Sequence, residues 1–161
     1  MFYEFNQNNS GGSFVVNDKL CHRLFIEADS SNEAIAKAED LGCYWNGVED
    51  GLDCPCCGDR WSCYWISPVD MNKFSTEGYT ISAYSGGKEK WKKRYGNYEV
   101  IEKPHSVSSF GITRFEGKIL FKTIEEYAQF LANEYGWTVP DIRIFYKDGE
   151  VLEIFKQTKE T

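Results

Sequence analysis

The sequence predicts an α+β fold in which a mainly antiparallel sheet carries two packed helices and a cysteine-rich, zinc-knuckle-like loop. Short aromatic and β-branched runs alternate with turn residues, and two capped amphipathic segments interrupt them. Five of the six cysteines fall within residues 43–63. At 161 residues with 42% hydrophobic side chains, the chain has the size of one domain and ample core material.

We expect a single domain over residues 1–161. Residues 1–68 are predicted to hold three strands, a helix and the cysteine-rich knuckle. Residues 69–96, rich in Gly, Ser and Lys, are predicted to form a basic loop excursion. Residues 97–161 are expected to add two strands, a helix and two further strands to the same fold.

The N-terminal strands are predicted at Phe2 to Phe5, Phe14 to Val16 and Leu20 to Ala28. Each run is rich in aromatic or β-branched residues, and Asn, Gly and Asp residues separate the runs. Their order and short connections predict a three-stranded meander.

Two helices are predicted from their end signals. Near Ser30, a serine hydroxyl is placed to accept from the first free amides of a helix, and the Glu33 carboxylate can accept from an amide just before it. Gly42 is predicted to end this helix after its apolar stripe. Thr123 and Glu126 form the same capping box before the second stripe.

The C-terminal part is predicted to return to strands after Gly136 stops the second helix. Ile142 to Tyr146 and Val151 to Phe155 predict a hairpin around an Asp-Gly turn. Strands near Tyr98 to Ile101 and Lys118 to Phe121 are expected to join the same sheet.

Charge and hydropathy exclude several classes of protein. A net charge of −7 argues against general DNA or RNA binding, which rests on neutralising phosphates. The N-terminus lacks the pattern of a signal peptide, and no segment approaches the ~20 apolar residues of a membrane span. We therefore expect a cytoplasmic protein without membrane contact, in which cysteines favour metal binding over disulfides. Homo-oligomer formation is left open.

The cysteine cluster predicts a structural zinc site. Cys54 and Cys57 form a C-x-x-C pair followed by glycine, the spacing that lets two thiolates reach one ion. No nearby carboxylate has a metalloenzyme spacing, which argues against a catalytic ion. Burial of the cysteines as small hydrophobic side chains is the alternative. The predicted ligands are Cys43, Cys54, Cys57 and Cys63, with His22 and Cys56 as alternates.

The string Asp53-Cys54-Pro55-Cys56-Cys57-Gly58-Asp59-Arg60-Trp61, with Gly11 to Phe14, Cys21 to Arg23 and Ile26 to Asp29, resembles an uncharacterised family of small proteins encoded by tailed bacteriophages. The resemblance covers roughly residues 1–65. It implies a phage origin and expression in an infected bacterial host, and it implies no mechanism.

The resemblance also implies that several of these residues converge on one face. Two guanidiniums and an indole there would suit an anionic, planar ligand such as a nucleotide. In the alternative interpretation, Arg60 pairs with Asp59 or Asp53 to brace the loop, and Trp61 packs on the sheet. The candidate ligand-binding residues are Ser13, His22, Arg23, Arg60 and Trp61, with Lys88 from the basic stretch.

The leading functional hypothesis is a non-enzymatic phage protein that counters a host defence as an inhibitor. It would sequester a nucleotide-type signal or dock on a host protein. The sequestering role predicts a concave pocket lined by Arg23, Arg60 and Trp61, whereas docking predicts an exposed apolar patch. A zinc- or thiol-dependent enzyme and a small structural or regulatory zinc module are the alternatives. Only His22 and His105 are available as bases, and nothing in the sequence brings either to a cysteine.

Overall fold

The structure is a computed structural model that describes residues 1–8, 12, 14–64, 66–83, 92–103, 115–134 and 142–155. The predicted single domain contains two compact units. The first unit combines Met1–Val69 with Ala128–Thr161, and the second is Asp70–Tyr127. None of the described helices reaches the length and apolarity that crossing a bilayer requires.

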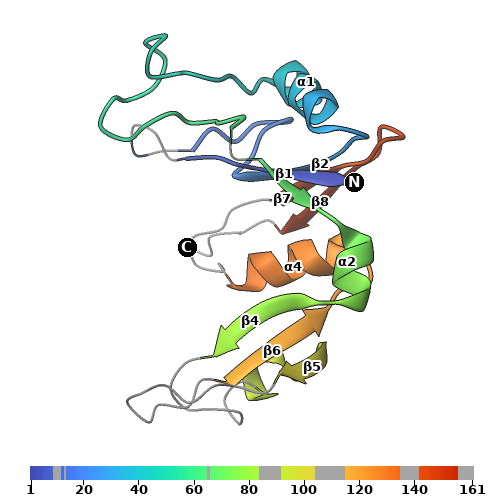
Figure 1. Ribbon diagram of the computed structural model, residues 1–161. Coiled ribbons are helices and arrows are strands. Elements are labelled where there is room, and N and C mark those ends of the chain that lie inside the picture. The colour runs from blue at the N-terminus through green and yellow to red at the C-terminus, as the bar shows by residue number, and fades with distance from the viewer. Residues whose placement is uncertain are drawn as a thin grey trace. The chain divides into compact units, whose positions relative to one another are not determined.

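A five-stranded sheet forms the centre of the first unit (Figure 1). Its strands, in spatial order, are β3 (Ser67–Val69), β1 (Phe2–Asn6), β2 (Arg23–Glu27), β7 (Ile142–Phe145) and β8 (Val151–Phe155). All neighbours run antiparallel except β2 and β7, which are parallel. The predicted α+β class with an antiparallel-rich sheet is confirmed.

Strand β2, at the centre of this sheet, is buried on both faces. Leu24 and Ile26 of β2 pack in one core cluster with Ala34 and Ala38 of α1 (Ser31–Leu41). The intervening Phe25 points to the opposite face and is also fully buried. Helix α1 lies over the first face, and the part of α4 that belongs to this unit lies over the second (Figure 1).

The predicted ends of helix α1 are confirmed. The Ser30 hydroxyl accepts from the Glu33 amide at 3.2 Å, and the Glu33 carboxylate accepts from the Asp29 amide at 3.1 Å. The chain leaves the helix at Gly42 with φ of 116°, a left-handed conformation that glycine adopts without strain.

The second predicted helix is α4 (Ile124–Glu134). Its capping box is confirmed, because the Thr123 hydroxyl accepts from the Glu126 amide at 3.2 Å and Glu126 accepts from the Lys122 amide at 2.9 Å. The predicted stop at Gly136 lies outside the described residues.

The predicted C-terminal hairpin is also confirmed, with β7 and β8 as its strands. Its turn closes through a bond from the Tyr146 amide to the Glu150 carbonyl at 2.9 Å. Gly149 occupies the turn with φ of 92°.

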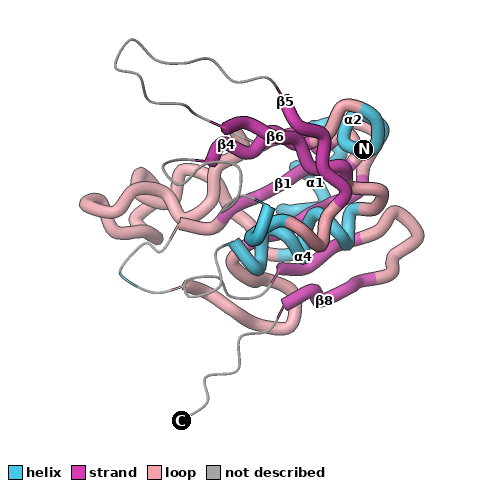
Figure 2. Tube along the Cα trace, turned by 90° about the horizontal axis from the view of Figure 1, so that it is seen from below, coloured by secondary structure: helices cyan, strands magenta, loops and turns pink. Residues whose placement is uncertain are grey.

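The expectation that all strands share one sheet was wrong. Strand β6 (Phe115–Leu120) pairs with β4 (Tyr79–Ala83) on one side and β5 (Glu99–Lys103) on the other, which makes a separate three-stranded sheet (Figure 2). A local sequence pattern can predict that a segment is a strand, but it does not determine which other strand it pairs with.

The second unit also contains much of the predicted 69–96 excursion. Within that stretch, α2 (Met71–Thr76) begins after Asp70, whose side chain accepts from two backbone amides of the first turn, and β4 follows it. Phe74 of α2 contacts the rings of Tyr79 and Tyr127, with centroids 5.6 Å and 4.9 Å away. Residues 84–91, which include Lys88, lie outside the described part of the chain, whereas Lys92, Lys93 and Arg94 of the basic stretch are described.

The predicted strand Phe14 to Val16 is not a strand, so the three-stranded meander is wrong. The Gln7 side chain takes the place of a partner strand at Val15. It accepts from the Val15 amide at 2.6 Å and donates to the Val15 carbonyl at 3.0 Å. Both backbone groups of Val15 are therefore satisfied without a ladder.

Candidate functional site

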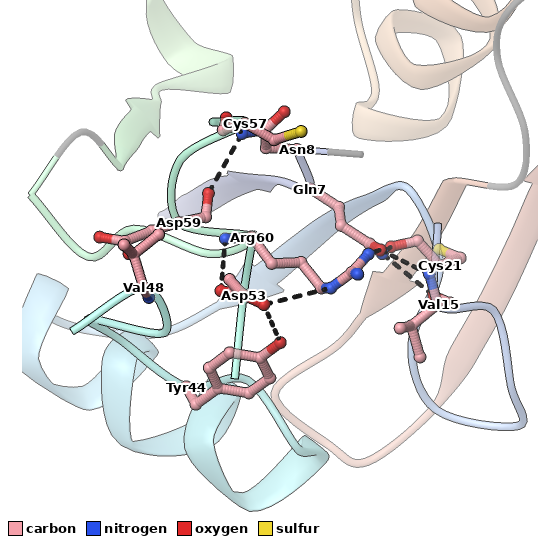
Figure 3. A network of polar contacts seen from close by, with 10 residues as sticks. All are labelled: Gln7, Asn8, Val15, Cys21, Tyr44, Val48, Asp53, Cys57, Asp59 and Arg60. Carbon is pink, nitrogen blue, oxygen red and sulfur yellow. Dashed lines mark hydrogen bonds and ion pairs between the residues drawn. The ribbon is translucent and has the colours of Figure 1, made fainter. Parts of the chain in front are cut away.

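The candidate site is formed by two loops of the first unit, which Figure 3 shows at close range. The first, residues 7–22, joins β1 to β2, and we call it the first loop. The second, residues 43–63, contains five cysteines, and we call it the cysteine-rich loop. The side chains of Gln7 and Asn8 and one backbone hydrogen bond, rather than a strand ladder, hold the two loops together.

Asp53 is the centre of the cysteine-rich loop. Its side chain is fully buried, and it accepts from the Tyr44 hydroxyl at 2.7 Å and the Arg60 amide at 2.8 Å. The Arg60 guanidinium lies 3.7 Å from the same carboxylate. Burial, followed by the hydrogen bond to Asp53, raises the pKa of Tyr44, so its hydroxyl stays the donor. A buried charge is thereby compensated by one cation and two donors.

Gln7 joins the first loop to the cysteine-rich loop. Its amide nitrogen donates to the carbonyls of Val15 and Cys21, both at 3.0 Å. Its oxygen accepts from the Val15 amide at 2.6 Å and from Arg60 Nη1 at 3.0 Å. These four bonds use both donors and both lone pairs of the side chain.

Asn8 makes the second connection. Its side-chain nitrogen donates to the Cys57 carbonyl at 2.6 Å and to the Asp59 carbonyl at 3.3 Å. Its backbone amide donates to the Arg60 carbonyl at 2.8 Å. The Asp59 carboxylate in turn accepts from the Val48 amide at 2.9 Å. The Cys57 to Arg60 segment is consequently fixed against the end of β1.

Three residues of this network were absent from the sequence-based site: Gln7, Asn8 and Tyr44. Gln7 is 53 positions away from the Arg60 that it contacts. An amide residue beside a strand carries no pattern that points to such a distant partner. Tyr44 lies next to Cys43, but no sequence pattern assigned it a role.

The cysteines divide into a buried group and an accessible group. Cys21 and Cys43 are buried, and burial, with the neighbouring Cys21, raises the pKa of Cys43 to about 12. Cys54 and Cys63 are partly exposed, and Cys56 and Cys57 are exposed. Hydrogen bonds from the Cys57 thiol, and then from the Cys56 and Cys57 amides, lower the pKa of Cys54.

The predicted zinc ligands are not gathered in the structure. Within the described ranges, no three His, Cys, Asp or Glu side chains are placed so that they could hold a metal ion together. Without a metal ion, the buried Cys43 thiol stays protonated over the neutral range, so zinc binding there would have to displace its proton. Zinc binding by Cys43, Cys54, Cys57 and Cys63, with His22 or Cys56 as alternates, stays a prediction.

Among the described candidates for ligand binding, Arg23, Arg60 and Trp61 do not present their side chains on one exposed face. Trp61 is only 1% exposed and lies in the core cluster with α1. Arg60 pairs with Asp53, as the alternative interpretation expected, and Arg23 lies 3.4 Å from the Glu4 carboxylate. Two further candidates, Ser13 and Lys88, lie outside the described residues.

His22 lies at the end of the first loop, against the ring of Phe14 at a centroid distance of 3.7 Å. Its Nδ1 is buried and has no hydrogen-bond partner among the described protein atoms. Desolvation lowers the pKa of His22 to about 4. The imidazole is therefore neutral at pH 7.

We expect the free energy of unfolding to decrease from pH 6.5 to about 4. In this window the unfolded His22 binds a proton near its ordinary pKa of 6.5, whereas the folded residue, with a pKa of about 4, does not. The unfolded state therefore binds more protons, and acid favours it. Urea unfolding at pH 7 and pH 5 measures the change. His22→Gln should reduce this pH dependence, and an unchanged dependence in that variant would contradict the assignment.

One family model matches the chain. It is described as a domain of unknown function, DUF7296, and it matches residues 1–103. This range contains both loops of the candidate site. No curated protein and no solved structure matches the chain.

Proposed function

The chain belongs to the DUF7296 family, and from that premise we propose that it is a non-enzymatic, phage-encoded binding protein that counters a bacterial host by docking on one of its proteins. The exposed apolar side chains of the two braced loops are the observation that carries this proposal. The phage origin rests on the D-C-x-C-C-G-D-R-W string.

Large apolar side chains are exposed on both loops. Leu52 and Tyr64, within and just after the cysteine-rich loop, are 64% and 74% exposed. Three consecutive residues of the first loop are also exposed, namely Phe14, Val15 and Val16. Exposing them to water is unfavourable in the free protein, and a partner that covers them would recover this cost.

The bracing of the loops supports docking. Gln7 and Asn8 tie the first loop and the cysteine-rich loop to each other before any partner arrives. A surface that is already ordered loses less conformational entropy on binding than a mobile one. The order of the two loops therefore supports a role in binding a protein.

The charge of the cysteine-rich loop indicates the chemistry of the partner. Glu49 and Asp50 are exposed beside Leu52. The only cation of this loop is Arg60, which is paired with Asp53. Exposed apolar side chains with exposed carboxylates near them in the loop are complementary to a host surface that has an apolar pocket and basic residues.

Sequestration of a nucleotide is less well supported. That role requires guanidiniums and an indole presented to the ligand. Arg60 and Arg23 instead pair with carboxylates, and Trp61 is buried. A host protein is therefore the partner that we propose.

We expect Leu52→Glu to weaken binding to the host partner by roughly 30-fold, which corresponds to the ~2 kcal/mol of an interface hot spot. Leu52 is 64% exposed, so the fold should be unaffected. Tagged protein is incubated with bacterial lysate, the retained polypeptide is purified, and its affinity is measured by titration. Val151→Glu is the matched control, because Val151 is 49% exposed on β8 and should leave binding unchanged.

Three results would contradict this function. The two variants could bind the purified host protein equally well. The protein could release an unchanged nucleotide on denaturation, which would support sequestration. It could also convert a small molecule, which would support the zinc- or thiol-dependent enzyme.

A further inference from the structure

The Cys54 to Cys57 turn brings two thiols together at the surface. The Cys54 carbonyl accepts from the amides of Cys57 and Gly58, both at 3.1 Å, so the chain reverses between the two cysteines. In such a turn the first and fourth Cα atoms lie within about 7 Å, and a disulfide needs about 4.4 to 6.8 Å. The Cys57 thiol already hydrogen-bonds to the Cys54 sulfur.

Both ends of this turn are anchored. Asp53, directly before it, is held by Tyr44 and Arg60. The Cys57 carbonyl, at its end, accepts from Asn8 at 2.6 Å. The two sulfurs therefore remain neighbours without any further ordering of the loop.

Accessibility separates this pair from the two buried cysteines, Cys21 and Cys43, but not from Cys56 and Cys63. Cys57 is exposed and Cys54 is partly exposed, so a small oxidant in solution can reach them. Cys21 and Cys43 are buried, and they provide an internal reference that should not react while the protein is folded.

We propose that Cys54 and Cys57 are a redox modification site at which a hydroperoxide converts the two thiols into a reversible disulfide. This inference does not depend on the docking function. It adds a covalent state of the cysteine-rich loop to the thiol form that the structure describes.

The reaction balances with the peroxide as the only oxidant. The Cys54 sulfur attacks the peroxide, an S–O bond forms as the O–O bond breaks, and the thiol proton leaves with the departing oxygen as water. The Cys57 sulfur then attacks the Cys54 sulfur, so that an S–S bond forms and the S–O bond breaks. The released hydroxide takes the Cys57 proton. The two sulfurs lose two electrons in total, and hydrogen peroxide is reduced to two waters.

The full-length protein, reduced and then treated with hydrogen peroxide, tests this site. We expect the six thiols to decrease by two and peptide mass spectrometry to find one Cys54 to Cys57 crosslink, which dithiothreitol removes. Cys21 and Cys43 should remain alkylatable after unfolding. A crosslink that contains Cys56, or overoxidation of Cys54 without a crosslink, would overturn the proposal.

Two variants keep the test decisive. In Cys57→Ser, oxidation should stop at a sulfenic acid on Cys54, which can be detected by its reaction with dimedone. Cys56→Ser should still form the disulfide, and loss of the disulfide in this variant would overturn the assignment of Cys57. Metal analysis of the untreated protein accompanies both. About one zinc ion per chain, with Cys54 and Cys57 protected from peroxide, would also overturn the proposal and would favour the zinc prediction.

Discussion

Replacement of Asp53 by alanine is expected to destabilise the folded chain by about 3 kcal/mol, the range for removing one partner of a buried ion pair. The Asp53 side chain is fully buried and the Arg60 side chain is 11% exposed, so water compensates poorly for the lost carboxylate. The Tyr44 hydroxyl and the Arg60 amide would also lose their acceptor. Chemical denaturation at pH 7 measures the change.

Two further variants define what the carboxylate contributes. Asp50→Ala, at an exposed position of the same loop, should remain within about 0.5 kcal/mol of the natural chain. Asp53→Asn preserves the shape but turns one acceptor into a donor that faces another donor, so it should still cost about 2 kcal/mol. If Asp53→Ala were as stable as Asp50→Ala, the network would not be what holds the loop.

The elements that could be predicted from the sequence are those whose determinants are local. Ser30 and Glu33 lie within one helical turn, and their positions specified where α1 begins. Thr123 and Glu126 did the same for α4. The Asp-Gly turn located the hairpin because its residues are consecutive.

The pairing of strands could not be predicted in the same way. The apolar run in Lys118 to Phe121 indicated a strand, yet that strand, β6, pairs with β4 and β5 and not with the five-stranded sheet. Phe14 to Val16 had the composition of a strand, but the side chain of Gln7 satisfied its backbone instead. In both cases the outcome depends on a partner that is distant in sequence.

The sequence drew attention to the string that contains the candidate site, but not to how its residues interact. The string from Asp53 to Trp61 was identified as its most informative part, and the structure places Asp53 and Arg60 at the centre of the network. A guanidinium next to carboxylates serves equally for bracing and for ligand binding, and burial decides between them. Because Trp61 is 1% exposed, the contacts left to a partner are the apolar side chains around the braced loop.

Gly47 shows how closely the loop is packed around this carboxylate. A Cβ atom at Gly47 would lie 1.9 Å from Asp53 Oδ2 and 2.7 Å from Tyr44 Cε2. The Gly47 carbonyl also accepts from the Leu52 and Asp53 amides, at 2.7 Å and 2.9 Å. The position thus excludes a side chain for lack of space, and the backbone has little freedom to move away.

We expect Gly47→Ala to destabilise the chain by about 3 kcal/mol, at the upper end of the cost of overpacking. Gly51→Ala separates crowding from backbone strain, because Gly51 has φ of 78° but no atom within 4 Å of the added Cβ. That variant should cost only about 1 kcal/mol, the strain of the left-handed conformation. Equal costs for the two variants would contradict the crowding argument.

The double variant of Gly47 and Asp53 tests whether the two residues act as one unit. If alanine at 47 destabilises the loop by displacing the Asp53 carboxylate, a chain that already lacks this carboxylate has room for the methyl group. The double variant should therefore be more stable than the sum of the single costs predicts, by at least about 1 kcal/mol. Additive costs would mean that the methyl group acts through the Tyr44 ring or the backbone, and that the carboxylate is not what makes glycine necessary here.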